Sequence, residues 1–209
     1  MVRVKICGIT NAADALAAVD AGANLLGFNF YEKSARYLTE SAAAKIRRQL
    51  PENVEAVGIF VNASAADIAA LCNSLRFHAA QLHGDESPEA VAELARSIPV
   101  IKAFRVEPEF SLKTLHEYCD ASAFLFDAAT TGQYGGTGRS TDWDVARRAA
   151  KDHRIILAGG LKVENVAAAV RIVRPYGIDV ASGVELKPGK KDHGRLREFI
   201  QEVRRGEKK

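Results

Sequence analysis

A cysteine and an aspartate each end a short apolar run in this sequence, and together they could perform acid–base chemistry. Cys7 ends the run Val-Lys-Ile-Cys, and Asp127 ends Phe-Leu-Phe-Asp. A thiolate can remove a proton and a carboxylic acid can donate one, so the two could serve as general base and general acid. Strand alternation places Lys5 on the same face as Cys7, where its ammonium would favour the thiolate. A lone cysteine is usually a small buried side chain and a lone aspartate is often structural, so neither residue decides the matter alone.

Two glycine-containing turns in the last third of the chain predict an anion site. Gly159 and Gly160 follow one apolar run and precede a helix-period stretch, while Ser182 and Gly183 follow the next run. Small residues let backbone N–H groups approach an anion closely. A single such pair could simply make a tight turn, but two on adjacent runs favour phosphate binding by Gly160, Ser182 and Gly183.

Three further polar residues are candidate substrate contacts. Arg36 lies in the long segment 31–40, where its planar fork could clamp a carboxylate or simply be solvated. His83 and Asp179 stand at or beside other apolar runs. His83 has no second histidine at metal-ligand spacing, so we expect no metal site. The glycine-rich segment 132–138 lacks the spacing of a nucleotide-binding loop, and its position after Asp127 predicts a mobile lid.

Short apolar runs alternate with longer helix-period stretches along the whole chain, which is typical of repeated strand–helix units. The expected strands are Val4 to Cys7, Leu25 to Phe30, Ala56 to Val61, Ala79 to Leu82, Val100 to Phe104, Ala123 to Asp127, Ile155 to Leu157 and Asp179 to Ala181. The expected helices are Ala12 to Ala21, Ser41 to Leu50, Ala65 to Asn73, Pro88 to Arg96, Leu112 to Tyr118, Trp143 to Lys151, Val163 to Val173 and Gly194 to Arg204. Asn11, Ser64, Ser87, Ser111 and Asp142 are the expected helix caps.

Eight strands and eight helices in one chain predict an α/β fold, a single (β/α)₈ TIM barrel that spans residues 1–209 as one catalytic domain. An open doubly wound sheet is the alternative, but it usually has fewer strands and leaves edges to protect. In such barrels the active site lies at the carboxyl ends of the strands, where Cys7 and Asp127 are expected to lie.

Composition narrows the class of protein. The chain has 209 residues, 47% of them hydrophobic, and a formal net charge of +3. Three widely spaced cysteines argue against a disulfide framework and fit a reducing compartment. The basic residues near the C-terminus have no interleaved aromatics, so we expect no nucleic-acid partner. With neither a signal-peptide pattern nor a membrane-spanning run, a cytoplasmic protein without membrane partner is expected.

At these residues the sequence resembles the phosphoribosylanthranilate isomerase family of tryptophan biosynthesis over nearly the whole chain. The matching segments are VKICGIT at 4–10, GFNFYEKSARY at 27–37, GIFVN at 58–62, QLHGDE at 81–86, FLFD at 124–127, YGGTG at 134–138, LAGGL at 157–161 and RPYGIDVASGVE at 174–185. They occur in family order. Ala35, Thr141 and Ala181 depart from the commonest family pattern without touching the acid or the base.

The resemblance implies an isomerase that performs an Amadori rearrangement without a cofactor. Its phosphorylated small-molecule substrate, N-(5-phosphoribosyl)anthranilate, would become 1-(2-carboxyphenylamino)-1-deoxyribulose 5-phosphate. Asp127 would be the general acid and Cys7 the general base. Arg36 would bind the anthranilate carboxylate and the glycine turns the phosphate, with His83 and Asp179 near the pocket.

Alternatives remain at this point. The related histidine-pathway isomerase typically has aspartate at the first-strand position, which Cys7 argues against. A lyase or synthase on the same barrel, such as one that closes an indole ring, is a second enzymatic alternative. Product analysis would distinguish it from the isomerase. A non-catalytic barrel that merely binds a phosphorylated metabolite would need only the glycine turns. We expect a monomer or a homodimer.

Overall fold

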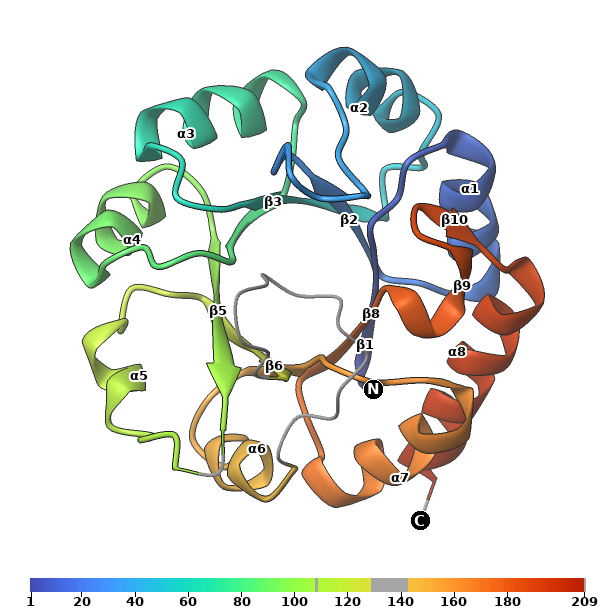
Figure 1. The fold of residues 1–209 in the computed structure, drawn as a ribbon. Coiled ribbons are helices and arrows are strands. Elements are labelled where there is room, and N and C mark those ends of the chain that lie inside the picture. Colours follow the sequence, from blue (N-terminus) through green and yellow to red (C-terminus); the bar gives the residue numbers. More distant parts are fainter. Residues whose placement is uncertain (108, 129–142, 209) are drawn as a thin grey trace.

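A computed structural model describes residues 1–107, 109–128 and 143–208 of the chain. Eight parallel strands close into a barrel in sequence order, and the helices surround it as an outer ring (Figure 1). The barrel strands are β1 (Arg3–Cys7), β2 (Leu25–Asn29), β3 (Glu55–Phe60), β4 (Ala79–Leu82), β5 (Val100–Val106), β6 (Ala123–Ala128), β7 (Ile155–Leu157) and β8 (Gly177–Val180). The helices are α1 (Ala12–Ala21), α2 (Glu40–Arg47), α3 (Ala65–Ser74), α4 (Pro88–Ala95), α5 (Thr114–Glu117), α6 (Trp143–Ala149), α7 (Val163–Val173) and α8 (His193–Glu207). This confirms the predicted barrel.

Alternation along the strands separates two apolar regions. Phe124 and Phe126 of β6 belong to the large cluster that includes helix residues, so they face outward under the helices. Leu125 belongs to a second cluster with no helix residue in it, which fills the barrel interior. Asp127 is two residues further along the same strand and therefore also faces inward. The predicted orientation of Asp127 is confirmed.

Several helix starts follow the predicted local chemistry. The side chains of Asn11, Ser64 and Ser87 accept hydrogen bonds from the backbone N–H groups three residues later, which caps α1, α3 and α4. The Ser111 prediction is wrong, because α5 begins after Lys113 without a side-chain cap. The chain ahead of α5 instead closes by tight turns, such as the Thr114 N–H to the Ser111 carbonyl. Asp142 lies outside the described residues.

The chain after β8 differs most from expectation. The strand was expected at Asp179 to Ala181, but β8 is Gly177–Val180, because Gly177 already pairs with Arg3 of β1. The chain then enters the 3₁₀ helix η1 (Ser182–Val184) and an unpredicted hairpin of β9 (Glu185–Lys187) and β10 (Lys190–Lys191). This hairpin packs charged side chains against the end of β1.

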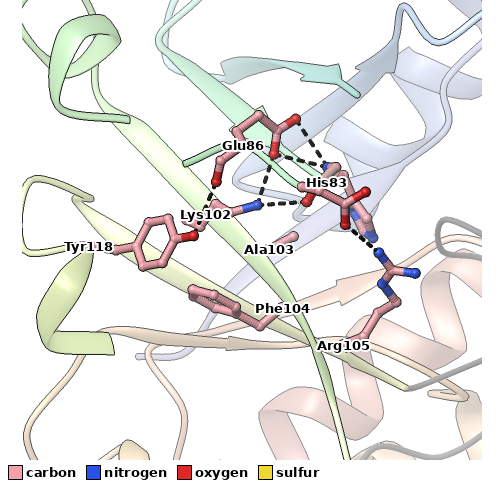
Figure 2. A pocket seen from close by; sticks show the side chains of 9 residues that line it. His83, Glu86, Lys102, Ala103, Phe104, Arg105 and Tyr118 are labelled. Carbon is pink, nitrogen blue, oxygen red and sulfur yellow. Dashed lines mark hydrogen bonds and ion pairs between the residues drawn. The ribbon is translucent and has the colours of Figure 1, made fainter. Parts of the chain in front are cut away.

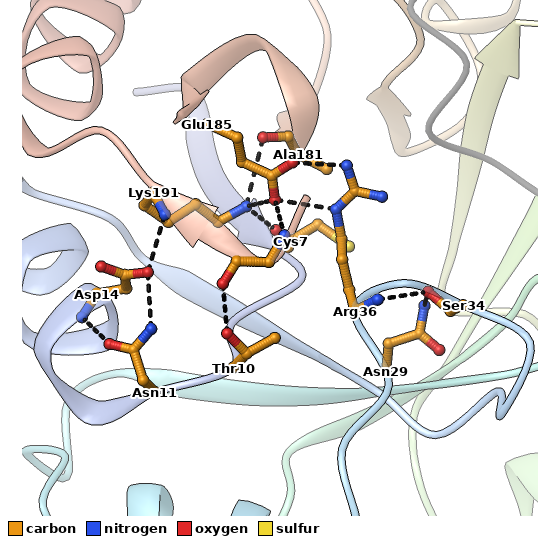
Figure 3. Close-up of polar contacts among 11 residues, drawn as sticks. Cys7, Thr10, Asn11, Asp14, Asn29, Ser34, Arg36, Ala181, Glu185 and Lys191 are labelled. Atoms are coloured by element: carbon orange, nitrogen blue, oxygen red, sulfur yellow. Dashed lines mark hydrogen bonds and ion pairs between the residues drawn. The ribbon is translucent and has the colours of Figure 1, made fainter. Parts of the chain in front are cut away.

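Asp14 of α1 ties this hairpin to the barrel. Its buried carboxylate accepts hydrogen bonds from the Lys191 backbone N–H and the Asn11 amide, each at 2.8 Å (Figure 3). The His193 ring donates to the same carboxylate, also at 2.8 Å. Burial alone would raise the pKa of Asp14, but these hydrogen bonds outweigh it and lower the pKa. Asp14 therefore stabilises the folded chain as a carboxylate.

Replacing Asp14 with Asn is expected to lower the free energy of unfolding near neutral pH by about 1 to 3 kcal/mol, because a charged acceptor is lost. A lowered native pKa gives stability that is present above the ordinary value of 3.8 and is lost as the pH falls through the native value. The difference between wild type and variant should therefore shrink in acid. Urea unfolding at neutral pH and near pH 3 measures it. Asp20→Asn, an exposed change in the same helix, is the control, and an Asp14 effect of equal size at both pH values would contradict the assignment.

Within the described residues, no helix has both the length and the apolar content needed to cross a membrane.

Candidate active site

The predicted site residues gather at one end of the barrel. Cys7 is the last residue of β1, His83 follows β4, and Asp127 is near the end of β6. Gly160 follows β7, and Ser182 follows β8. Because parallel strands in a closed barrel end on the same side, these residues surround one opening.

Cys7 is a free, half-buried thiol that faces the barrel interior. A side chain at Gly27, its partner on β2, would meet the Cys7 Sγ at 3.2 Å, so glycine leaves room beside the sulfur. Burial raises the pKa of Cys7, and the Asp179 carboxylate adds to that effect. The positive charges of Lys5, Lys191 and Arg36 lower the pKa but do not outweigh burial. In the free protein near neutral pH, Cys7 is therefore mainly a thiol.

The expectation that Lys5 makes Cys7 a thiolate needs correction. Lys5 faces inward as predicted, but its Nζ lies 3.0 Å from the Asp179 carboxylate in the barrel interior. The two are adjacent in register on β1 and β8. Burial of the thiol outweighs the effect of Lys5, and the negative charge of Asp179 acts against Lys5 as well, so the pKa of Cys7 is raised. Asp179 is buried and paired with Lys5, and its expected contact with substrate stays a prediction.

Arg36 reaches over the end of β1 and is held by a carboxylate that the sequence did not single out. Its Nε and Nη2 donate to the two carboxylate oxygens of Glu185 at 2.9 and 2.6 Å (Figure 3). A side chain at Gly8 would lie 2.2 Å from the Arg36 Cδ, so only glycine lets the arginine cross here. A guanidinium has five N–H donors. The edge formed by the two terminal nitrogens is left for a second carboxylate.

Asp127 and His83 lie together on the other side of the opening. The His83 Nε2 is 3.4 Å from an Asp127 carboxylate oxygen, and its Nδ1 is 2.9 Å from the Gln81 amide nitrogen. If the amide donates to Nδ1, the neutral ring carries its proton on Nε2, toward Asp127. Both Asp127 and Gln81 are buried. The structure thus brings His83 and Asp127 together and adds Gln81, which fixes the ring.

The two glycine turns are in direct contact. A side chain at Gly183 would lie 2.0 Å from the Leu161 carbonyl oxygen, so the turn after β8 packs on the backbone of the turn after β7. Gly159 and Gly160 both have positive φ angles, of 78° and 64°, which favour glycine. The Asn165 amide holds the Gly160 carbonyl at 2.9 Å. The predicted phosphate residues Gly160, Ser182 and Gly183 therefore form one surface beside the start of α7.

A pocket of about 330 Å³ opens beside His83 between the ends of β4 and β5 (Figure 2). A buried ion pair forms its floor, with the Lys102 Nζ at 2.8 Å from both the Glu86 carboxylate and the Gly84 carbonyl. The Tyr118 hydroxyl donates to the Glu86 carbonyl. These bonds stiffen the loop that carries His83. In the described part of the chain, no cluster of three or more His, Cys, Asp or Glu could hold a metal ion.

Sequence reasoning missed Glu185, Lys191 and Gln81. Glu185 and Lys191 belong to a charged stretch that is typical of a solvated loop, and only tertiary contacts show that both are buried. Gln81 was available as a signal, because a polar side chain inside an apolar strand needs a partner when it is buried. The predicted lid, 132–138, lies outside the described residues.

The comparisons with known proteins agree over the whole chain. Residues 4–202 match the family model of N-(5'-phosphoribosyl)anthranilate (PRA) isomerase. An N-(5'-phosphoribosyl)anthranilate isomerase of Pelobacter propionicus is 52% identical over 201 residues, which covers 96% of this chain and 95% of the relative. The Acidithiobacillus ferrooxidans enzyme of the same name is 48% identical over 98% of both chains.

Solved structures give the same result. The phosphoribosyl anthranilate isomerase of Thermotoga maritima has a TM-score of 0.91 and 41% identity, and the match covers 98% of this chain and 99% of that one. A phosphoribosyl anthranilate isomerase in complex with reduced 1-(o-carboxyphenylamino)-1-deoxyribulose 5-phosphate has a TM-score of 0.87 and 40% identity, with the same coverage. The chain belongs to the N-(5'-phosphoribosyl)anthranilate isomerase family.

Proposed function

We propose that the protein converts N-(5-phosphoribosyl)anthranilate to 1-(2-carboxyphenylamino)-1-deoxyribulose 5-phosphate by an Amadori rearrangement, with Asp127 as general acid and Cys7 as general base. The observation that carries this proposal is that a thiol, a carboxyl group, an arginine fork and two touching glycine turns surround one barrel opening. The substrate has a carboxylate at one end, a phosphate at the other and the reacting carbons between them. The proposed setting is the tryptophan pathway.

In the first step Asp127 donates a proton to the ribose ring oxygen. The bond between that oxygen and C1 breaks, and the nitrogen lone pair forms a C1=N bond, which gives an open-chain Schiff base. His83 lies beside this carboxylate, with its Nε2 at 3.4 Å from an Asp127 oxygen. Proton donation by a positioned carboxyl group is the ordinary role of a general acid.

In the second step the Cys7 thiolate removes the proton from C2. The C–H electrons form a C1=C2 bond and the C=N electrons return to nitrogen, which gives an enolamine. Loss of the C2 hydroxyl proton and protonation of C1 then give the ketone. All atoms of the substrate remain in the product, so no oxidant, metal or nucleotide is consumed.

The two ends of the substrate fix its orientation. Glu185 holds one edge of the Arg36 guanidinium, so the substrate carboxylate can bind the terminal edge as a second bidentate partner. The phosphate would lie on backbone N–H groups of Gly160, Ser182 and Gly183. Asp179, paired with Lys5 below the thiol, acts on the site through its charge.

Gly183→Ala tests the phosphate position. The added carbon cannot fit 2.0 Å from the Leu161 carbonyl oxygen, so the turn must move away from its neighbour. We expect KM to rise by about tenfold or more, because a phosphate held by backbone N–H groups loses its geometry. Steady-state kinetics measures this, with Gly194→Ala at the start of α8 as the control. An unchanged KM would place the phosphate elsewhere.

The overall reaction has a direct test. The purified protein, treated with EDTA, is mixed with N-(5-phosphoribosyl)anthranilate, and the product is identified by mass spectrometry and by its carbonyl group. We expect turnover to the ribulose phosphate without added metal or nucleotide. Correctly folded protein that binds this compound without turnover would favour the binding-only barrel and overturn the proposal.

The oligomeric state, monomer or homodimer, stays a prediction that light scattering can test. A related Thermotoga maritima structure is described as monomers generated from a dimeric enzyme.

A further inference from the structure

Lys191 is wholly buried although it carries an ammonium group, and no step of the proposed reaction uses it. Its Nζ donates to three oxygens: the Cys7 carbonyl at 2.5 Å, the Ala181 carbonyl at 3.3 Å and the Glu185 carboxylate at 2.8 Å (Figure 3). An ammonium group has three N–H donors, so these acceptors satisfy it completely. Burial of a charged group costs free energy unless its partners compensate it, so the positions of these three oxygens matter for keeping the ammonium group buried.

The two carbonyls lie where the pairing of β1 with β8 stops. The last paired residues are Ile6 and Val180, and the next residues along the two strands are Cys7 and Ala181. Lys191 therefore bridges the two strands in place of the next ladder step. The end of β1 carries Cys7, the proposed base. The chain after β8 leads directly into Ser182 and Gly183, the proposed phosphate-binding turn, called the phosphate turn below.

Glu185 connects this bridge to the arginine fork. Its carboxylate is buried and accepts from Lys191 on one side and from both donors of the Arg36 edge on the other. These charged groups lower the pKa of Glu185 even though burial would raise it. A fixed carboxylate between two cations holds Arg36 in one orientation. Buried polar contacts of Glu185 and Lys191 thus connect Cys7, Arg36 and the proposed phosphate-binding turn that begins at Ser182.

We propose that Glu185 and Lys191 are positioning residues of the reaction: Lys191 sets the main chain of Cys7 and of the phosphate turn, and Glu185 sets the Arg36 fork. The role rests on the function proposed above, because Cys7 and Arg36 are its reacting and binding groups. A purely structural ion pair would affect stability alone. The positioning role and the purely structural role can be distinguished with variants that change the buried charges and the stability of the fold independently.

Four variants make this separation: Lys191→Met, Glu185→Gln, the double variant, and Lys190→Met as the control. Lys190 is the exposed neighbour of Lys191 in β10. Lys191→Met leaves the buried Glu185 carboxylate with Arg36 as its remaining cation, and Glu185→Gln leaves the buried Lys191 ammonium without a carboxylate. Each single change is therefore expected to lower Tm, whereas the double change removes both charges and restores part of Tm. The double variant therefore keeps the test valid if a single variant fails to fold.

Kinetics with N-(5-phosphoribosyl)anthranilate gives the first readout. Lys191→Met is expected to lower kcat by about 10- to 100-fold, and Glu185→Gln to raise KM by about tenfold with a smaller change in kcat. The double variant should remain at least about tenfold below wild type in kcat/KM, even where it is folded at the assay temperature. Wild-type kcat and KM in the double variant would overturn the proposal. Lys190→Met should match wild type.

Alkylation of Cys7 by iodoacetamide, followed by peptide mass spectrometry, needs no turnover. The charged groups around the thiol are Lys5, Asp179, Arg36 and the Glu185 and Lys191 pair. Loss of the Lys191 charge should slow alkylation at a fixed pH by at least about threefold, whereas simple loosening of the site would speed it. If the wild type shows no turnover, the proposed function fails, and this rate alone decides the role of Lys191. An unchanged or faster rate in folded Lys191→Met protein would overturn that role.

Discussion

Replacing Cys7 with Ala is expected to lower kcat by about 10²- to 10⁴-fold, the contribution of a positioned general base. Alanine keeps the backbone at the end of β1 but cannot accept a proton. KM should change little, because the proposed carboxylate and phosphate contacts come from Arg36 and the glycine turns and not from Cys7. Steady-state kinetics of the purified variant measures both constants.

Cys119→Ala is the matched control. Cys119 is exposed and lies between α5 and β6, at the amino end of the barrel strands and away from the opening. Its replacement should leave kcat unchanged. A Cys7→Ala variant with near-normal turnover would remove Cys7 from the mechanism.

The pH dependence of the wild type supports the same assignment. Burial raises the pKa of the Cys7 thiol above its ordinary value of 9.0, so the free enzyme holds little thiolate near neutral pH. A base that must be deprotonated gives a kcat/KM that increases with pH below that pKa. We expect kcat/KM to rise between about pH 6 and pH 8 for this reason. Cys7→Ala should lose this increase, and a wild-type profile that falls across the same range would contradict Cys7 as the base.

Replacing Asp127 with Asn is expected to have a comparable effect, a fall in kcat of about 10²- to 10⁴-fold. The amide has nearly the same shape as the carboxyl group, but it cannot donate a proton to the ribose ring oxygen. The fold should survive, because the inward position of this side chain is set by Leu125 and the rest of β6. Thermal unfolding measured beside the kinetics separates lost chemistry from lost structure.

Asp152→Asn is the control for charge. Asp152 is exposed and lies just before β7, at the opposite end of the barrel from Asp127. Its variant should match wild type in kcat. Normal turnover in Asp127→Asn would assign the proton donor to another group on the rim.

The barrel itself was predictable from the sequence because its signals are local. Apolar alternation, Gly or Pro punctuation and helix caps such as Asn11 and Ser87 depend on residues only a few positions apart. They predicted the eight barrel strands and the eight helices around them in the right order, with boundaries off by a few residues, but not the hairpin of β9 and β10. Where a glycine joined a strand, as at Gly177, pattern reading placed the start too late.

The candidate site was predictable only in part. Strand-end positions identified Cys7, Asp127 and His83, and the contact of the two glycine turns agrees with a shared phosphate surface. Glu185 and Lys191 gave no signal, because charged residues beside a proline and a glycine usually lie in water. Their burial depends on partners more than 140 positions away in the chain, such as Arg36 and Cys7.

The effect of Lys5 on the thiol also depends on distant partners. The face of Lys5 was predictable from β1 alone, but the Asp179 carboxylate that accompanies it comes from β8. The sign of a pKa shift is the sum of burial and all nearby charges. One favourable neighbour in sequence was therefore not enough to predict a thiolate.

A crystal structure of the protein with the reduced product analogue, reduced 1-(o-carboxyphenylamino)-1-deoxyribulose 5-phosphate, tests the central claim most directly. We expect the phosphate on the backbone N–H groups of Gly160, Ser182 and Gly183, and the carboxylate on the terminal edge of Arg36. The Cys7 sulfur and the Asp127 carboxylate should then lie within about 3 to 3.5 Å of the reacting atoms. A ligand bound with its sugar carbons away from Cys7 and Asp127 would contradict the proposed acid and base.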